Sequence, residues 1–391
     1  MNLSKRMIAL FAVGAGISVA NLYYLQPLLI MMGHTVHASV KHMGLVATLT
    51  QTGYALGLLL IVPLADILPR KTLMIGLSFF TAVALVGESF SHAFLPLTLF
   101  SFCIGALTVV PQIIIPLVAD LSSPERRGQA IGVVMGGLLL GVLLARTVSG
   151  AVGALLGWQA MYWIAAGMML VLAGVFFFTI HNITPTRSMR FSDLVRSVLS
   201  IAKKYRVLRH SALIGASLFA AFSALWTVLA YRLDSPPYHF NSAIVGLFGL
   251  VGAAGVLAAP FTGRVSDKLG PRFMVGVGIL STLVAYIALF MLSANLYAFI
   301  IAIVIMDFGT QAAQIANQTR IYALDANARN RINSVYMVTY FLGGAIGSAL
   351  GSYFYSLVGW YGAMSVSIAM VLIALMVHYA LPFLQATSST E

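Results

Sequence analysis

The sequence predicts an all-α membrane protein in which twelve transmembrane helices form two six-helix bundles. Three observations support this prediction: an apolar composition, an uneven distribution of basic residues and a repeat that relates the two halves of the chain. Of the 391 residues, 60% are apolar and 8% are charged, and the mean hydropathy is +0.96. Because a water-soluble domain usually contains about 25% charged residues, the composition argues against a soluble enzyme, a disordered chain and a nucleic-acid-binding domain.

Twelve apolar stretches are each long enough to cross a bilayer, which requires about 20 helical residues. The predicted spans are 7–33, 43–64, 73–90, 94–117, 129–155, 160–180, 210–231, 243–261, 273–292, 296–322, 332–355 and 363–381. The longest connection follows the sixth span. We therefore expect an N-terminal bundle over residues 1–180, a cytoplasmic linker over 181–209 and a C-terminal bundle over 210–391.

The basic residues favour one side of the membrane. Nineteen of the 22 Lys and Arg residues lie on the side of the N-terminus, whereas only Lys41 and Arg232 lie on the other side and Arg146 lies deep inside a span. The positive-inside rule then places both termini in the cytoplasm of a multi-pass protein of the inner or plasma membrane. The net charge of +12 therefore reports orientation and does not indicate a nucleic-acid partner.

The 181–209 linker contains a predicted amphipathic helix. Its apolar residues recur at helical spacing, at Phe191, Leu194, Val195, Val198, Leu199, Ala202 and Tyr205. Ser192 and Asp193 can cap its start, while lysines crowd its end. We expect this helix to lie on the cytoplasmic face, against anionic headgroups or the ends of the bundles.

The two halves repeat each other at a separation of about 201 residues. Asp66 corresponds to Asp267 and Lys71 to Arg272, and further pairs follow at Gly141 and Gly343 and at Gly157-Trp158 and Gly359-Trp360. Because each half has an even number of helices, both halves keep the same orientation. Such a parallel repeat predicts a solute site near the centre of the fold.

Three segments resemble the major facilitator superfamily, and the resemblance extends over essentially the whole chain. Residues 62–71 (VPLADILPRK) and 263–272 (GRVSDKLGPR) are similar to its loop G-x-L-A-D-x-x-G-R-K, although Val62 and Pro69 replace two glycines in the first copy. Residues 21–29 (NLYYLQPLL) resemble the first helix of the drug- and sugar-efflux branch, which includes drug:proton antiporters. The resemblance implies two bundles that alternate access to a central site.

The resemblance also implies a cytoplasmic gate. Its expected members are Asp66, Arg70, Lys71, Asp267, Lys268 and Arg272. Asp66 would face the start of the eleventh helix, and Asp267 the start of the fifth, because the free N–H groups of a helix start carry a partial positive charge. The alternative is that these residues only cap helices or anchor the topology.

Asp307 is the most informative charged residue inside a span. It lies 11 residues into the tenth span, about 16 Å deep, and Gln311 and Gln314 follow on the same helical face. Placing a charge at the bilayer centre costs about 2.5–3.5 kcal/mol, so a carboxyl at this depth is expected to have a specific role. We predict that it couples transport to protons. The alternative is a structural role in helix packing.

Two other charged residues lie nearer the outer surface. Arg146 is expected about 26 Å from the cytoplasmic side, where it either snorkels to the outer headgroups or meets an anionic group between the halves. Glu88 is expected at the outer surface.

Two motifs that the family's antiporters carry are incomplete here. The fifth span reads Gly137-x-x-x-Gly141-Val142-x-x-Ala145-Arg146 and lacks the proline and the final glycines of the antiporter motif. Ser101 stands where drug antiporters often carry arginine, so these motifs do not establish proton coupling.

The remaining polar and aromatic residues of the spans predict a solute cavity. Its expected lining is Asn21, Tyr24, Gln26, Gln51, Tyr54, Gln112, Arg146, Trp226, Gln311, Gln314, Tyr336 and Tyr340. Trp226 could equally belong to the aromatic belt at the membrane interface. Pro111 and Pro116 are expected to bend the fourth helix. The glycines in the eighth and eleventh spans allow close approach of neighbouring helices. They serve either helices that slide past each other where the two halves meet or helix packing without movement.

These features predict a secondary transporter of a small organic solute that works by alternating access, with proton-coupled efflux as the implied mode. A proton symporter or a facilitator is the alternative within this class, and a channel or membrane receptor is the alternative outside it. The sequence shows no phosphate loop, catalytic pair or metal motif, and it has one cysteine, Cys103. We therefore expect no enzyme activity and no cofactor, a proton gradient as energy source, and a monomer in the bilayer.

The charge distribution makes the topology testable. Single cysteines placed at Ser235 and Thr387, in a chain in which Cys103 is replaced by serine, should react with a membrane-impermeant reagent from opposite sides of the membrane. Thr387 should be labelled from the cytoplasm because it follows the twelfth span. Labelling of both positions from the same side would contradict the predicted number of spans.

Overall fold

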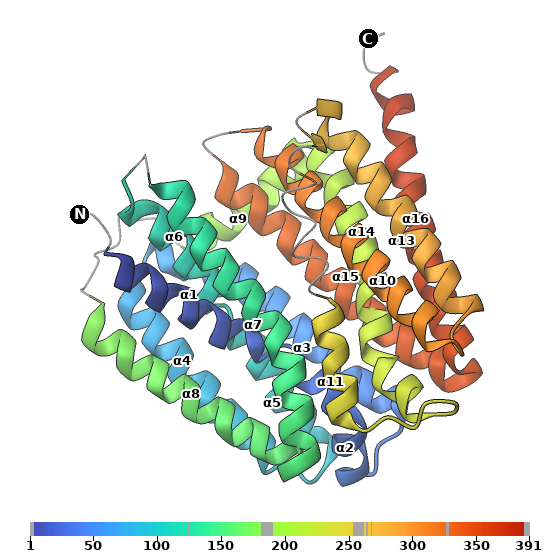
Figure 1. Cartoon of the computed structure of the whole chain (residues 1–391). Helices are drawn as coiled ribbons and strands as arrows, with labels where there is room; N and C mark the ends of the chain where they lie inside the picture. Colours follow the sequence, from blue (N-terminus) through green and yellow to red (C-terminus); the bar gives the residue numbers. More distant parts are fainter. Residues whose placement is uncertain are drawn as a thin grey trace. The chain divides into compact units, whose positions relative to one another are not determined.

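The computed structural model describes residues 4–123, 126–180, 191–252, 262, 265–266, 268–325 and 328–386. Its regular structure over these residues is helical throughout (Figure 1). The helices gather into two compact units. The first comprises Met1–Ser39, Leu49–Val195 and Phe240–Leu250, and the second comprises Val40–Thr48, Arg196–His239 and Val251–Glu391.

The first unit contains most helices of the N-terminal half. They are α1 (Lys5–Ala20), α2 (Leu25–Thr35), the 3₁₀ turn η1 (Val62–Asp66), α4 (Arg70–Ser89), α5 (Phe94–Leu107), α6 (Val110–Leu121), α7 (Arg127–Leu156) and α8 (Trp158–Thr179). Helix α3 (Val40–Leu60) contributes to both units, and most of α11 (Ser242–Val251) belongs to the first.

The second unit contains the helices of the C-terminal half. They are α10 (Arg206–Asp234), α13 (Pro271–Met291), α14 (Leu296–Tyr322), α15 (Arg329–Val358) and α16 (Trp360–Ala386), together with most of α9 (Phe191–Lys204). Eleven helical stretches of the described chain are long and apolar enough to cross a membrane. The eighth predicted span, 243–261, is described as far as α11, and residues 253–261 lie outside the described part.

Two spans are interrupted at prolines. The first span divides into α1 and α2 at residues 21–24, and the fourth divides into α5 and α6 at Thr108–Val109. Pro27 and Pro111 each lack the N–H group that would bond to the carbonyl four residues earlier, at Tyr23 and Leu107. The predicted bend of the fourth helix is thus confirmed, whereas the break in the first helix was not foreseen.

The repeat is visible in the corner that joins the last two helices of each half. Gly157 lies between α7 and α8 with φ +85°, and Gly359 lies between α15 and α16 with φ +67°. Only glycine adopts this backbone conformation without steric cost. The following tryptophan anchors each corner, because Trp158 Nε1 donates to Thr35 Oγ1 at 2.9 Å and Trp360 Nε1 donates to the Leu289 carbonyl at 2.9 Å.

Small residues bring equivalent helices into backbone contact within each unit. A Cβ atom on Gly141 of α7 would overlap the Gly16 carbonyl of α1, and a Cβ atom on Gly343 of α15 would overlap the Ala216 carbonyl of α10. Gly141 and Gly343 occupy matching positions of the repeat. Close packing of this kind contributes strongly to helix association in a membrane, where lipid supplies little hydrophobic driving force.

The predicted amphipathic helix is present as α9. Val198 and Ile201 are buried, whereas Arg196, Lys203 and Lys204 are exposed. At the end of the helix, the Tyr205 hydroxyl donates to Asp325 at 3.0 Å. Protein therefore covers these two apolar side chains, so they are not exposed to lipid headgroups.

The close packing of α10 and α15 can be tested by adding a methyl group at the contact. Gly343→Ala should destabilise the protein by about 1–3 kcal/mol, because the added methyl group has no room against the Ala216 backbone. Gly174→Ala is the matched control, since a Cβ there meets no atom within 4 Å. It should be neutral or stabilising by up to about 1 kcal/mol through helix propensity. Thermal unfolding in detergent measures both, and equal midpoints for the two variants would contradict the packing argument.

Candidate functional site

Arg146 forms the centre of a polar cluster in the first unit. Its side chain is 4% exposed, and its Nε donates to Gln26 Oε1 at 2.5 Å. The guanidinium lies 4.9 Å from the centre of the Tyr23 ring. A side chain that snorkels to the headgroups would be exposed, so that alternative is wrong. Arg146 instead points to α2, because the break at residues 21–24 presents Tyr23 and Gln26 to α7.

Tyr54 and Gln112 form a second polar pair in the same unit. Gln112 Nε2 donates to the Tyr54 hydroxyl at 3.2 Å, which connects α6 with α3. Tyr54 is buried and interacts electrostatically with Tyr23. The described contacts therefore join four of the predicted cavity residues in two pairs, Gln26 with Arg146 and Tyr54 with Gln112.

Other predicted cavity residues of the first unit have different surroundings. The Asn21 side chain donates to the Ser18 carbonyl at 3.0 Å, so this bond serves the break between α1 and α2. Tyr24 is buried next to the same break, and Gln51 is half-buried on α3. A contact of these residues with solute stays a prediction.

An aromatic cluster occupies the second unit. Tyr340 on α15 stacks on Phe219 of α10 with ring centres 4.1 Å apart, and its hydroxyl donates to Gln314 Oε1 at 3.1 Å. Tyr336 lies parallel to Tyr340 at 6.0 Å. Phe219 and Phe222 were not among the predicted cavity residues, although both lie on the helical face of α10 that carries Trp226, at a spacing of three and four residues.

Trp226 belongs to this cluster and not to a belt at the membrane interface. Its side chain is 2% exposed, and its ring centre lies 5.9 Å from that of Phe222. An interfacial tryptophan would present its ring to headgroups. The aromatic cluster is therefore internal to the second unit, where it can pack against a solute or simply against itself.

Asp307 lies 11 residues after Leu296, where α14 begins, so its predicted position along the helix is confirmed. The carboxyl is 3% exposed and interacts electrostatically with the Tyr286 hydroxyl of α13. Gln311 and Gln314 are half-buried further along α14. The α13 and α14 backbones approach closely beside it, because a Cβ atom on Gly309 would lie 2.8 Å from the Gly278 carbonyl oxygen.

Glu88 is not at the outer surface, so that expectation is wrong. The side chain is 1% exposed, and Glu88 Oε1 accepts a hydrogen bond from Ser101 Oγ at 2.8 Å. The carboxyl points between α4 and α5, while Phe90, two residues further along, is the residue that is exposed. Depth in the span was predictable from sequence, but the direction of the side chain depends on which helices cover that face.

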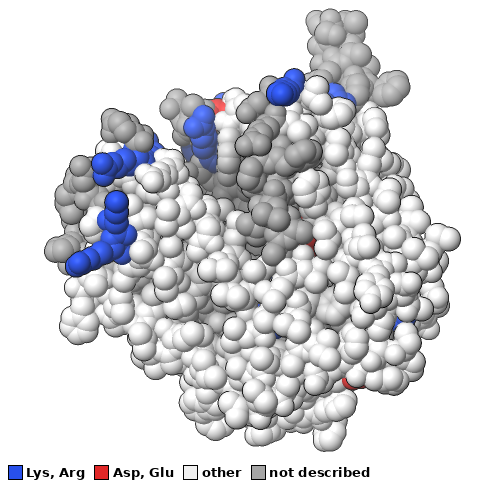
Figure 2. Space-filling model, in the orientation of Figure 1, with Lys and Arg blue, Asp and Glu red and all other residues white. Residues whose placement is uncertain are grey.

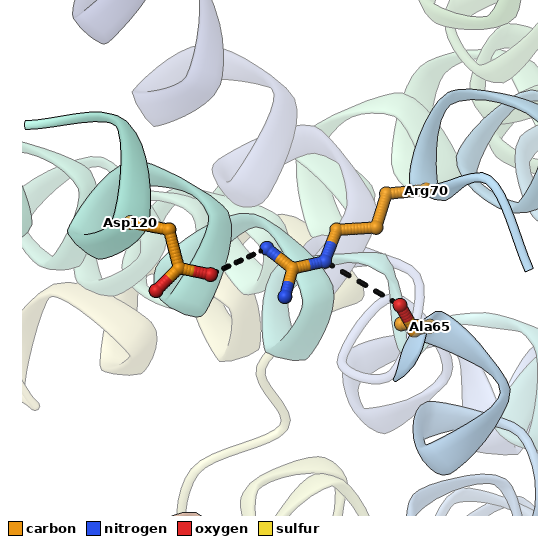
Figure 3. Close-up of polar contacts among 3 residues, drawn as sticks. All are labelled: Ala65, Arg70 and Asp120. Carbon is orange, nitrogen blue, oxygen red and sulfur yellow. Dashed lines mark hydrogen bonds and ion pairs between the residues drawn. The ribbon is translucent and has the colours of Figure 1, made fainter. Parts of the chain in front are cut away.

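Arg70 organises the predicted gate loop in a different way from the expected one. Its guanidinium pairs with Asp120 at the end of α6 at 2.8 Å and donates to the Ala65 carbonyl at 3.4 Å (Figure 3). Asp66 itself is exposed. The Lys71 ammonium lies 5.3 Å from the centre of the Phe177 ring. These contacts connect α4 to its neighbours inside the first unit.

The second copy of the gate loop is only partly described. Asp267 lies outside the described residues. Lys268 is exposed, and Arg272 donates to the His378 carbonyl at 3.4 Å. The proposed role of both loops in gating therefore stays a prediction.

Exposed basic residues lie where helices begin. In the first unit they include Lys5 and Arg6 at α1 and Arg126 and Arg127 at α7. Figure 2 shows most basic side chains in view at ends of the helices, with uncharged residues along the flanks. A band of uncharged surface next to charged ends is the pattern expected of helices that cross a bilayer. Among the described residues, no group of three His, Cys, Asp or Glu side chains could hold a metal ion.

The chain matches known transporters over almost all of its length. The model of the Major Facilitator Superfamily matches residues 11–258 and 235–390. The uncharacterised transporter YgaY of Escherichia coli O157:H7 is 36% identical over 377 residues, which cover 96% of each chain.

Solved structures show the same fold. A bacterial homologue of the human lysosomal transporter Spinster, in an inward-facing and occupied conformation, superposes with a TM-score of 0.79 at 18% identity and covers 98% of this chain and 96% of its own. The human organic anion transporter MFSD10 gives a TM-score of 0.70 at 15% identity, with 96% and 99% covered. The family match, the relative and the fold agree, and we conclude that the chain belongs to the major facilitator superfamily and is a multi-pass membrane transporter, not an enzyme.

Proposed function

We propose that the protein is a secondary transporter that exports a small organic solute in exchange for protons, by alternating access. The observation that carries this proposal is Asp307, a carboxyl that is buried inside a membrane span near the predicted midplane. Carboxyls at this depth are rare and are typically functional, because their charged form is costly there. Binding and release of a proton would therefore change the energy of the second unit.

The proposed direction of transport has separate support. Residues 21–29 resemble the first helix of the efflux branch, and the structure places Tyr23 and Gln26 of this segment against Arg146. The antiporter motif of the fifth helix is incomplete, so export depends on this segment alone. Symport and facilitated uptake are the alternatives that transport measurements must distinguish.

The two clusters suggest what the solute looks like. The first unit offers a guanidinium and amide groups at Arg146 and Gln26, and the second offers aromatic faces at Phe219 and Tyr340. Solute sites usually combine apolar walls with a few directed polar groups. We propose a small amphipathic organic solute, and an anionic group on it would suit Arg146. The similar fold of an organic anion transporter is consistent with this class.

We further propose that the protein works as a monomer in the inner or plasma membrane, with both termini in the cytoplasm and a proton gradient as its only energy source. The exposed basic residues at the starts of α1 and α7, together with the half-buried Arg70 and Lys71 at the start of α4, support this orientation. The gate is proposed to use Asp66 and Asp267, with nearby basic residues completing each cluster.

Asp307→Asn tests the coupling. In proteoliposomes with an imposed pH gradient, a panel of anionic, neutral and cationic compounds first identifies a solute. The variant should then lose gradient-driven accumulation, because asparagine cannot titrate, but should keep solute exchange between equal concentrations. Asp234→Asn is the matched control, since this carboxyl is exposed at the end of α10 and should leave both activities unchanged.

The pattern of losses separates the alternatives. A misfolded variant, or one that has lost a solute contact, would lose exchange as well as accumulation. If Asp307→Asn accumulates solute at the wild-type level, the carboxyl has a structural role and the coupling proposal fails.

Asp66→Asn tests the gate. Removal of a charge that faces a helix start would destabilise the outward-open state, in which the cytoplasmic side is closed, by about 0.3–2 kcal/mol. The population would then shift toward the inward-open state. Spin labels at the exposed positions Thr72 and Thr319 should then report longer distances. Asp234→Asn is the control, because Asp234 is exposed at the end of α10 and lies outside the proposed gate. Unchanged distances in Asp66→Asn would show that Asp66 only caps a helix and has no role in the gate.

A further inference from the structure

A second buried carboxyl lies in the first unit and has no part in the function proposed above. Glu88, in the last turn of α4, is 1% exposed. Ser101 Oγ of α5 donates to its Oε1 at 2.8 Å, and the Tyr162 hydroxyl of α8 interacts electrostatically with the carboxyl. The other oxygen, Oε2, has no hydrogen-bond partner among the described residues.

The groups that face Glu88 from the neighbouring helices carry no positive charge. Helix α5 contributes Ser101 and the Cys103 thiol, and α8 contributes the Tyr162 hydroxyl. In the part of the chain that the structure describes, no Lys, Arg or His forms an ion pair with Glu88. An ionised carboxylate in such surroundings has only neutral donors to replace water, whereas the protonated acid needs no counter-charge. The site therefore suits a carboxyl that holds a proton.

Glu88 lies close to the end of its membrane-spanning helix. The residue lies in the last turn of α4, and His92, four residues further along, is exposed. One helical turn spans about 5.4 Å, so a proton would cross only a fraction of the membrane to reach the carboxyl. Since α4 begins at Arg70 on the predicted cytoplasmic side, this end would face the outside.

Tyr162 connects Glu88 with α2. Its hydroxyl lies 3.9 Å from the Met32 sulfur, and its ring packs on Trp158, whose indole donates to Thr35. A thioether is a weak acceptor, whereas a carboxylate accepts a strong, charge-assisted bond. Loss of the Glu88 proton would therefore draw the Tyr162 hydroxyl away from Met32. Helix α2 also carries Gln26, the partner of Arg146.

We propose that Glu88 is a second proton-binding site of this transporter, exchanging with the outer aqueous phase, and that Tyr162 transmits its protonation state to α2. The step is the transfer of one proton from hydronium in the outer aqueous phase to a carboxylate oxygen: one O–H bond of hydronium breaks, the O–H bond of the acid forms, and water is released. The proposal goes beyond the assignment of coupling to Asp307, and its test requires no identified solute.

Infrared difference spectroscopy of the purified full chain in lipid nanodiscs tests proton binding directly. Between about pH 4 and pH 10, the wild type should show a carbonyl band of a protonated carboxylic acid that disappears as the pH rises. Glu88→Gln should remove this band, whereas Asp307→Asn should retain it. Ser101→Ala should keep the band but move its midpoint upward by roughly one pH unit, because the lost donor stabilised the carboxylate.

The outcomes decide the proposal even if Glu88→Gln folds poorly, because the Ser101→Ala shift provides a second measurement on an intact carboxyl. A Glu88 band that never titrates in this range would make the residue a permanently protonated packing group and overturn the proposal. The absence of any band that depends on Glu88 and Ser101 would overturn it as well. A failure here leaves the transport result for Asp307→Asn unaffected, so the two proposals fail separately.

Hydrogen exchange tests the transmission to α2. At a pH where the wild-type carboxyl is ionised, Glu88→Gln imitates the protonated form. Peptides that cover residues 25–35 should exchange at different rates in the wild type and Glu88→Gln, and this difference should vanish when both chains also carry Tyr162→Phe. Equal exchange in the wild type and Glu88→Gln would show that the proton is not sensed by α2.

Discussion

The absence of water from the hydrocarbon core is the constraint on which this structure depends. The hydrocarbon offers no hydrogen-bond partner, so a polar group inside a span can find one only within the protein. The contacts of Arg146 with Gln26, Tyr340 with Gln314 and Glu88 with Ser101 each provide such a partner from another helix. Each polar side chain consequently fixes the rotation of the helix that carries it, so the groups suited to function also determine how the helices pack.

Sequence alone predicted the parts of the fold that depend on composition along the chain. The tenth span was predicted at the bounds that α14 adopts, because its flanking residues are polar and its interior is apolar. The break between α1 and α2 was missed, although Pro27 supplies its cause. A proline three residues into a helix is compatible with both a helix start and a kink, and only tertiary packing distinguishes them.

The candidate site was predictable in depth but not in direction. Asp307 was placed correctly along its helix, whereas Glu88 was assigned to the surface and one of two alternatives for Arg146 was wrong. Hydropathy reports how far a residue lies along a span. The side on which it lies depends on the neighbouring helices, and these are set by contacts between residues more than a hundred positions apart, such as Gln26 and Arg146.

The glycine-tryptophan corners have a mechanical consequence. Each corner joins two long helices through a turn that only glycine adopts readily, and an indole hydrogen bond ties that turn to a third helix. To separate any of these three helices at this end, the indole hydrogen bond must break or the glycine turn must change its backbone conformation. Within each half, the spacing of three helices is therefore set at one end by hydrogen bonding and backbone geometry as well as by side-chain packing.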